Sequence, residues 1–152
     1  MQEDTEITGQ PVADIYLASD RTDGAFILYL EDVDQDGLVR YITEGELRGI
    51  DRKISSGTPP YRVVGPYQSF RKEDELPLKP GKVAELKFSM MPISVLIRAG
   101  HRIRIALAGA DADTFERIPE SGDAVYAVHR DRVYPSHVVL PLVPRPSDGT
   151  SP

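Results

Sequence analysis

The clearest candidate for chemistry is the alternation of carboxylates in DVDQDG, formed by Asp32, Asp34 and Asp36 and closed by Gly37. Acidic residues at alternate positions before a glycine open the loops that bind Ca²⁺, because their oxygens converge on a hard cation. A complete loop of this kind has a bidentate glutamate at its twelfth position, which here is Thr43. The residues on both sides alternate as strands do. We therefore predict a hairpin turn and no metal site, and the three aspartates remain the candidate ligands.

Histidine is a common catalytic base of hydrolases and serine a common nucleophile, but neither shows a catalytic pattern in this sequence. The histidines His101, His129 and His137 are far apart in the sequence and lack the spacing of metal ligands. We interpret them as surface histidines near strand ends. The chain has no G-x-S-x-G motif, and no serine occupies the strand-to-helix turn that an α/β-hydrolase nucleophile needs. The sequence thus predicts no catalytic residue and no cofactor.

The elements that would position these residues are strands. Apolar and polar residues alternate most clearly at 83–90 and again at Arg102–Ala108, a pattern typical of half-buried strands. The stretch Ile93–Ile97 alternates as well. Ala99-Gly100 then supplies the positive φ that a tight reversal needs. Residues 93–108 are therefore expected to form a β-hairpin.

Further strands are expected at 3–8, 12–19, 25–33, 38–47, 124–129 and 137–143. The strand at 25–33 is predicted to be central, because its apolar residues fall on both faces. Pro141 confines the last strand to an edge of its sheet. No long window repeats its apolar residues at helical spacing. About nine short strands separated by turns predict an all-β jelly-roll β-sandwich.

The composition fits one domain, since 152 residues that are 40% hydrophobic can build one core but not two ordinary ones. We expect a single jelly-roll domain at 1–146, with a long surface excursion at 48–80 that is rich in proline and charge, and a disordered tail at 147–152. The chain has no cysteine, which excludes disulfides and thiolate metal sites.

The charge and hydropathy patterns exclude two classes of partner. The net charge is −6, from 18 basic and 24 acidic side chains without a basic block, which argues against a nucleic acid or an anionic membrane as a partner. No signal peptide is visible, and no window approaches the roughly 20 apolar residues of a membrane span.

Both faces of the strand at 25–33 need cover. Phe26, Leu28 and Leu30 alternate with Ile27 and Tyr29, so the sandwich core can bury only one face. The other face needs the excursion at 48–80 or a second domain. We expect Ile27 and Tyr29 to form an exposed apolar patch, through which the isolated chain self-associates.

Three phrases occur in a fixed order: the run FILYLEDVDQDG followed by Thr43-Glu44-Gly45, the phrase P-G-x-V-x-E-L-x-F at 80–88, and AGHRIR at 99–104. With them the chain, over about 6–144, resembles the C-terminal domain of the hydrolase family of X-Pro dipeptidyl-peptidases, cocaine esterase and α-amino acid ester hydrolases. The resemblance implies a galactose-binding-domain-like jelly roll that packs on an α/β-hydrolase catalytic domain. In that family the Ser-Asp-His triad belongs to the catalytic domain, so no triad residue is carried over to this chain.

One loop departs from the family. The family usually has a phrase rich in proline, aromatic residues and asparagine after the strand at 102–108, whereas this chain reads ADADTFERIPESGD. Phe115, Arg117 and Pro119 match this phrase loosely, and the asparagines are missing.

The resemblance implies a non-catalytic accessory domain of an α/β-hydrolase-type serine hydrolase, either an acyl esterase or an enzyme like the X-Pro dipeptidyl-peptidases. Its expected role is to brace the catalytic domain and help wall the substrate pocket. The alternative is a stand-alone carbohydrate-binding jelly-roll module. Such a module binds sugars on exposed aromatic side chains, and this chain has no tryptophan and only 7% aromatic residues.

Overall fold

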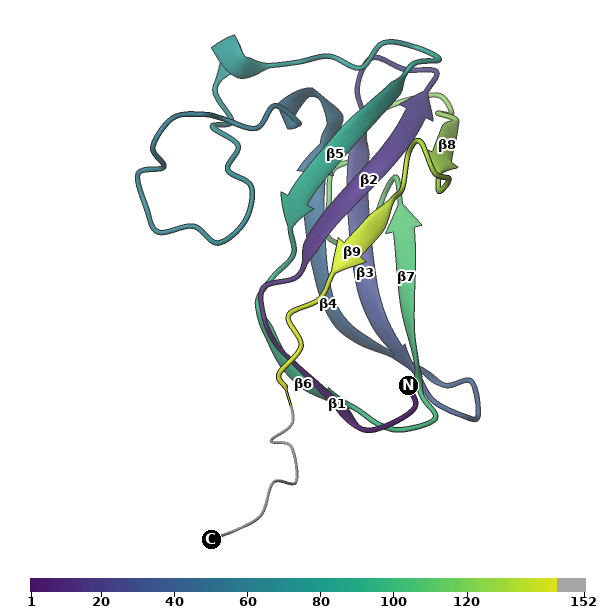
Figure 1. Ribbon diagram of the computed structural model, residues 1–152. Coiled ribbons are helices and arrows are strands. Elements are labelled where there is room, and N and C mark those ends of the chain that lie inside the picture. Colours follow the sequence, from purple (N-terminus) through teal and green to yellow (C-terminus); the bar gives the residue numbers. More distant parts are fainter. Residues whose placement is uncertain (145–152) are drawn as a thin grey trace, which may run out of the picture.

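Nine segments of the chain form strands in the computed structural model, which describes residues 1–144 (Figure 1). Outside these strands, the described residues contain only two 3₁₀ turns, Gly49–Asp51 and Lys72–Asp74. The all-β prediction is confirmed, while the tail expected at 147–152 lies outside the described residues. The strands are β1 (Thr5–Gly9), β2 (Val12–Ser19), β3 (Ala25–Val33), β4 (Val39–Arg48), β5 (Val83–Ser89), β6 (Ile93–Ile97), β7 (Arg102–Ala108), β8 (Tyr126–His129) and β9 (His137–Val139).

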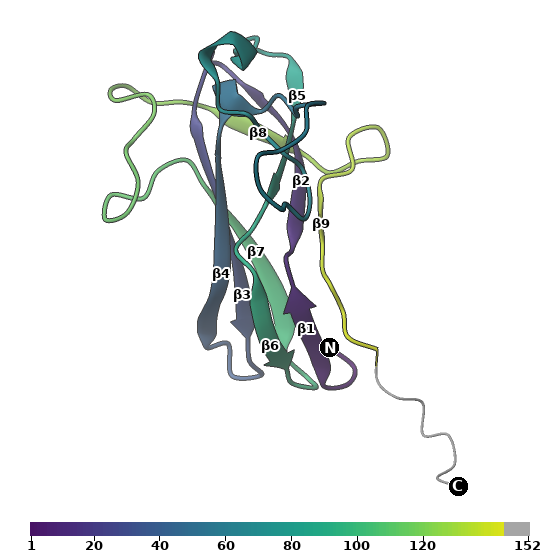
Figure 2. The same ribbon diagram turned by 90° about the vertical axis from the view of Figure 1, so that its left-hand side faces the viewer.

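The described strands form three antiparallel sheets: β1 pairs with β6, and two larger sheets face each other, as the side view in Figure 2 shows. In one sheet the order is β4-β3-β7, with β3 in the centre as the sequence predicts. In the other sheet β2 is central, with β5 on one side. The opposite side of β2 pairs with β8 near its end and with β9 near its start. The described part of the chain has no helix long and apolar enough to cross a membrane.

The core lies between the sheets and follows from the alternation in β2 and β3. Ile15 and Leu17 of β2 and Leu28 and Leu30 of β3 are all buried and belong to one apolar cluster. The cluster also contains Ala13, Phe26, Leu47, Leu78, Leu86, Phe88 and Met90. Burial of each large apolar side chain stabilises the fold by roughly 1.5–3 kcal/mol, which is the main force that holds the two sheets together.

The hairpin predicted at 93–108 is wrong. β6 pairs with β1, whereas β7 pairs with β3 in another sheet. The turn between them is held by the N-terminal segment, since the Asp4 carboxylate accepts a hydrogen bond from the Ala99 N–H (2.8 Å) and pairs with Arg98 (2.8 Å). Gly100, with φ of 82°, supplies the expected reversal, but it directs the chain from the β1-β6 sheet to the sheet of β3 and β7.

The two sheets come closest where β4 passes the bend between β5 and β6. The Glu44 carbonyl accepts a hydrogen bond from the Met91 N–H (2.8 Å), and the Thr43 hydroxyl donates one to the Met91 carbonyl (3.1 Å). A Cβ on Gly45 would lie 2.8 Å from the Met90 Cα. The Thr43-Glu44-Gly45 triplet therefore joins the two sheets backbone to backbone.

Candidate interaction surface

The aspartates of DVDQDG do not converge on one point. One carboxylate oxygen of Asp34 accepts hydrogen bonds from the N–H groups of Asp36 (3.0 Å) and Leu38 (2.9 Å), and the other pairs with Arg40 (3.1 Å). Burial alone would raise the pKa of Asp34, but these hydrogen bonds and the arginine lower it. Asp32 instead contacts His101 (2.9 Å), and Asp36 is exposed. Within residues 1–144, no group of three or more potential ligands could hold a metal ion.

We expect Ca²⁺ at millimolar concentration to leave the melting temperature of the chain unchanged, because a ligand that binds only the native state must raise it. Calorimetry or circular dichroism with Ca²⁺ and with a chelator measures this effect. An upward shift that Asp34→Ala abolishes would instead show that the turn binds the cation.

The histidines lie at separate places in the fold. His101 precedes β7 and contacts Asp32. His129 in β8 lies 3.8 Å from an Asp131 carboxylate oxygen, and its ring packs against that of Tyr134. His137 in β9 contacts the Pro135 carbonyl through Nδ1 (2.7 Å). None of these contacts joins a histidine to a serine side chain, so the described residues show no Ser-His-Asp arrangement.

The outer face of β3 is not bare, contrary to the expectation of an uncovered patch at Ile27 and Tyr29. Ile27 is only 1% exposed. Phe115 and Ile118, from the loop at 110–123, line a hollow together with it. The sequence pointed to the excursion at 48–80 or a second domain as the cover. The loop after β7 supplies part of the cover, because β7 pairs beside β3, and Phe70 of the excursion lines the same hollow.

A tyrosine–carboxylate hydrogen bond anchors the loop at 110–123 to β3. The Tyr29 hydroxyl donates to an Asp111 carboxylate oxygen at 2.5 Å. This hydrogen bond, with burial adding to it, raises the pKa of Tyr29 to about 12. The same bond, helped by the Asp113 N–H, holds the pKa of the Asp111 carboxyl below its ordinary value. The link thus requires a protonated tyrosine and an ionised aspartate.

We expect Tyr29→Phe to lower the urea midpoint at pH 7, with a difference from wild type that depends on pH. Since the folded state raises the pKa of Tyr29, the stabilisation is full below pH about 10 and is lost as the pH rises towards 12. Since it lowers the pKa of Asp111, the stabilisation is also lost as the pH falls below about 4. Tyr61→Phe, in an exposed tyrosine, is the control. A midpoint difference that stays constant from pH 3 to 12 would contradict this account.

The hollow above Ile27 has a volume of about 290 Å³ and is mainly apolar. Phe70, a residue that is 64% exposed, lines it from the connection between β4 and β5. Among the described residues, Phe70 alone of the non-glycine residues has a positive φ, 53°. A bulky residue in this region is strained, and such strain is commonest at functional sites. Phe70 is therefore held, at a cost to stability, as an exposed aromatic side chain beside an apolar hollow.

The rim of the hollow is acidic. Glu46, Asp51 and Glu116 line it, and the one lining base, Arg48, is already paired with Asp23 at 2.7 Å. Burial raises the pKa of Glu46, and the neighbouring Glu44 adds to this shift. Burial also raises the pKa of Asp51. The surface therefore suits a partner with a projecting apolar group and basic residues around it.

The sequence alone does not indicate this surface. Phe70 and the lining residues from the 110–123 loop lie in segments without periodicity, so only the general preference of binding residues for loops could have indicated them. Of the loosely matched loop residues, Phe115 lines the hollow above Ile27. Arg117 and Pro119 line a neighbouring pocket with Tyr126.

Known proteins resemble this chain in sequence and in fold. A family model described as the X-Pro dipeptidyl-peptidase C-terminal non-catalytic domain matches residues 1–139. A Mycobacterium tuberculosis protein that bears the provisional name of a serine esterase is 49% identical over 138 residues, which are 91% of this chain and 22% of that protein. Cocaine esterase from a Rhodococcus species is 25% identical, over 92% of this chain and 24% of the esterase.

Solved structures share the fold. A CocE/NonD family hydrolase from Staphylococcus aureus superposes with a TM-score of 0.77 at 16% identity, over 95% of this chain and 29% of the hydrolase. An α-amino acid ester hydrolase superposes with a TM-score of 0.75 at 16% identity, over 94% of this chain and 24% of that structure. The chain thus spans about a quarter of the length of the proteins it matches.

Proposed function

This chain belongs to the family of X-Pro dipeptidyl-peptidase C-terminal non-catalytic domains, and we propose that it serves an α/β-hydrolase-type serine esterase or peptidase as its accessory domain. Its work is to brace the catalytic domain and to help wall the substrate pocket. The names of its relatives, which include a cocaine esterase, support the esterase class.

The surface for this task is the hollow lined by Ile27, Phe70, Phe115 and Ile118. The observation that carries the assignment is the exposed, strained Phe70, because an isolated domain gains nothing from holding an aromatic ring in solvent at the cost of backbone strain. Aromatic side chains that insert into a partner dominate the energy of many interfaces. The catalytic domain is expected to receive Phe70 and to present basic residues to Glu46 and Glu116.

A pure sample of the chain is expected to lack hydrolase activity, because its sequence has no G-x-S-x-G elbow to place a serine beside donors that stabilise a developing negative charge. Turnover of p-nitrophenyl esters and of an X-Pro dipeptide substrate measures this activity. Labelling with a fluorophosphonate, which marks activated serines, gives an independent readout. Turnover that disappears when one serine is replaced by alanine would overturn the proposal.

A further inference from the structure

Strand β5 forms an edge of its sheet, since in residues 1–144 only β2 pairs with it. In an antiparallel pair, backbone groups of successive residues point alternately to the partner and away from it. The Lys87 carbonyl accepts a hydrogen bond from the Gln68 side chain (2.7 Å), so the backbone of Lys87 points away from β2. Val83 and Glu85 share this orientation, because they are an even number of residues away. Gln68 occupies the Lys87 carbonyl, so the free part of this edge is the backbone of Val83 and Glu85, which can accept another strand.

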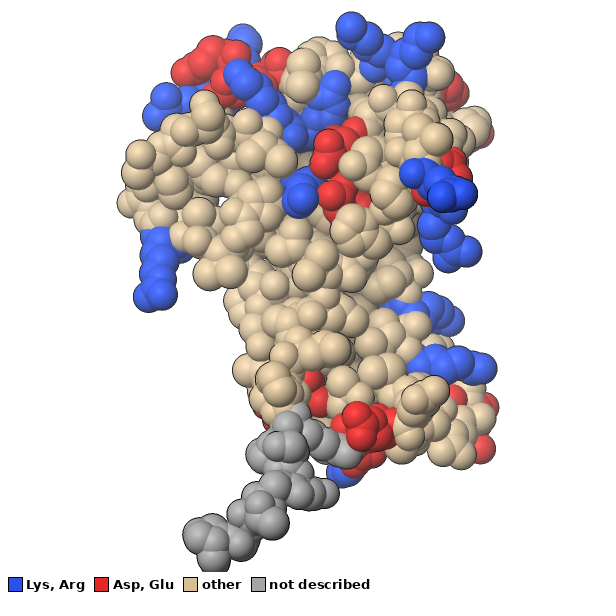
Figure 3. All heavy atoms as spheres, viewed as in Figure 1, with Lys and Arg blue, Asp and Glu red and all other residues tan. Residues whose placement is uncertain are grey.

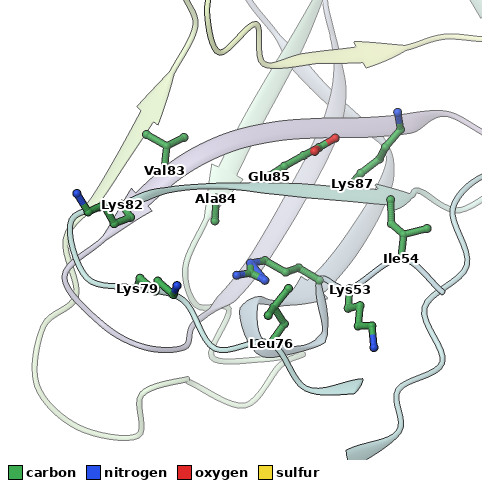
Figure 4. Close-up of a pocket in the computed structure, with 10 residues that line it drawn as sticks. Lys53, Ile54, Leu76, Lys79, Lys82, Val83, Ala84, Glu85 and Lys87 are labelled. Atoms are coloured by element: carbon green, nitrogen blue, oxygen red, sulfur yellow. The ribbon is translucent and has the colours of Figure 1, made fainter. Parts of the chain in front are cut away.

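A pocket of about 360 Å³ lies beside this edge, between β5 and the long connection from β4 (Figure 4). Part of its lining is aliphatic: Ile54 and Leu76, from the connection, are 47% and 44% exposed. Figure 4 shows Ala84 on the side of β5 that faces Leu76, while Glu85 and Lys87 point to the other side. A ligand in this pocket would contact both apolar side chains and the strand edge.

The charge of the pocket is opposite to that of the chain. Five basic residues and one acidic residue, Glu85, line it, although the chain as a whole carries a net charge of −6. Figure 3 shows several Lys and Arg side chains over the upper part of the molecule, where Figure 1 places β5. The five are Arg52, Lys53, Lys79, Lys82 and Lys87. Such a local excess attracts anionic groups and repels cationic ones.

Three of these cations have no counter-ion. Lys53 pairs with Asp74 and Lys87 with Asp14, but no carboxylate of the described residues pairs with Arg52, Lys79 or Lys82. Arg52 donates one hydrogen bond, to the Pro77 carbonyl (3.3 Å), and its partial burial lowers its pKa. A partly buried guanidinium with unused donors suits a carboxylate or a phosphate, which it can bind through two parallel hydrogen bonds. In Figure 4, Lys79 and Lys82 lie together at one end of the pocket.

We propose that the free edge of β5 binds an extended acidic peptide segment, which adds to the sheet as a strand and places its carboxylates against Arg52, Lys79 and Lys82. A free phosphate would satisfy these cations, but it would leave the edge and the exposed Ile54 and Leu76 unused. A segment that alternates acidic and aliphatic residues would contact the cations, the two apolar side chains and the strand edge. This site is separate from the hollow at Phe70, and the proposal does not rest on the accessory-domain function.

The test uses the whole 152-residue chain and a fluorescein-labelled Glu-Val-Glu-Val-Glu-Val peptide. Fluorescence anisotropy at low salt is expected to show saturable binding that weakens in 0.5 M NaCl, whereas the Lys-Val peptide of equal length does not bind. Lys79→Glu with Lys82→Glu is expected to weaken binding at least tenfold, and Arg52→Gln at least threefold. The matched control reverses the same number of charges at Arg130 and Arg132, which are exposed beyond β8, and is expected to change the affinity less than twofold.

A second variant separates strand addition from simple charge attraction. Glu85→Pro removes an N–H from the free edge and leaves the hydrogen bonds to β2 intact, which an edge strand tolerates. It is expected to weaken peptide binding at least tenfold with little change in melting temperature, and the peptide is expected to shift the amide NMR signals of Val83 and Glu85 in the wild type.

The alternative is that the lysines beside this edge bind no peptide and serve only to prevent two copies of the chain from pairing. Absence of saturable peptide binding, or binding of inorganic phosphate without any peptide effect on these amides, would overturn the proposal.

Discussion

Replacing Gly45 by alanine is expected to destabilise the fold by about 3 kcal/mol, at the upper end of the usual cost of overpacking. The new Cβ would lie 2.8 Å from the Met90 Cα and 2.9 Å from the Ser89 carbonyl oxygen. Both are backbone atoms, so a rotation of side chains cannot relieve the contact. Alanine also restricts the unfolded chain, which favours folding by only about 0.4–1 kcal/mol. The steric cost therefore outweighs this gain.

Urea unfolding of Gly45→Ala measures the effect, with Gly57→Ala as the control. Gly57 lies in an exposed loop, where a Cβ would meet only the Ser55 hydroxyl at 3.4 Å. The control is expected to stay within about 0.5 kcal/mol of wild type, as surface substitutions usually do. Wild-type stability in Gly45→Ala would show that the two sheets do not meet at this glycine.

Replacing Lys87 by methionine is expected to cost about 3 kcal/mol, because it leaves the buried carboxylate of Asp14 without a counter-ion. The Asp14 side chain is 7% exposed, and one oxygen lies 3.2 Å from the Lys87 Nζ. The other oxygen has no hydrogen-bond partner in the described residues. The lysine is therefore the main compensation for this buried charge.

The matched control is Lys82→Met, which removes the same charge from the same pocket at an exposed lysine without an ion pair. It is expected to change the free energy of unfolding by less than about 0.5 kcal/mol. The double variant Asp14→Leu with Lys87→Met removes both partners and is expected to recover most of the loss. Equal stabilities for Lys87→Met and Lys82→Met, measured by urea unfolding, would contradict a buried carboxylate at Asp14.

The sequence predicted the strands because alternation is a local signal. Val12–Ser19 and Ala25–Val33 agree with β2 and β3 at both ends. Pairing is not local, and this is why the hairpin at 93–108 was wrong. Ala99-Gly100 requires a reversal in either case, and the choice of partner depends on distant residues such as Asp4. DVDQDG could be identified as a turn because the backbone N–H groups that bond to the Asp34 carboxylate lie within four residues of it.

The candidate surfaces could not be predicted either, because their residues are distant in the sequence and only the fold brings them together. Phe70 and Phe115 are 45 positions apart in the sequence, and only the path of the chain over β3 brings them to one hollow. The cations beside β5 come from 52–53 and 79–87, two stretches that residues 54–78 separate in the sequence. The family phrases were informative because they hold the architecture together: Gly45 at the contact between the sheets, and Gly100 and His101 at the crossing into β7.

The most direct test of the accessory role is the affinity of this chain for a catalytic domain. The M. tuberculosis relative, with its matched region removed, supplies one, since that region is 49% identical to this chain. Isothermal titration of the two proteins is expected to show saturable one-to-one binding. Phe70→Asp is expected to weaken it at least tenfold, as loss of an aromatic anchor does, while the control Val133→Asp, at an exposed valine beyond β8, leaves it unchanged. Absence of binding, or equal affinities for Phe70→Asp and wild type, would contradict the proposed docking through this hollow.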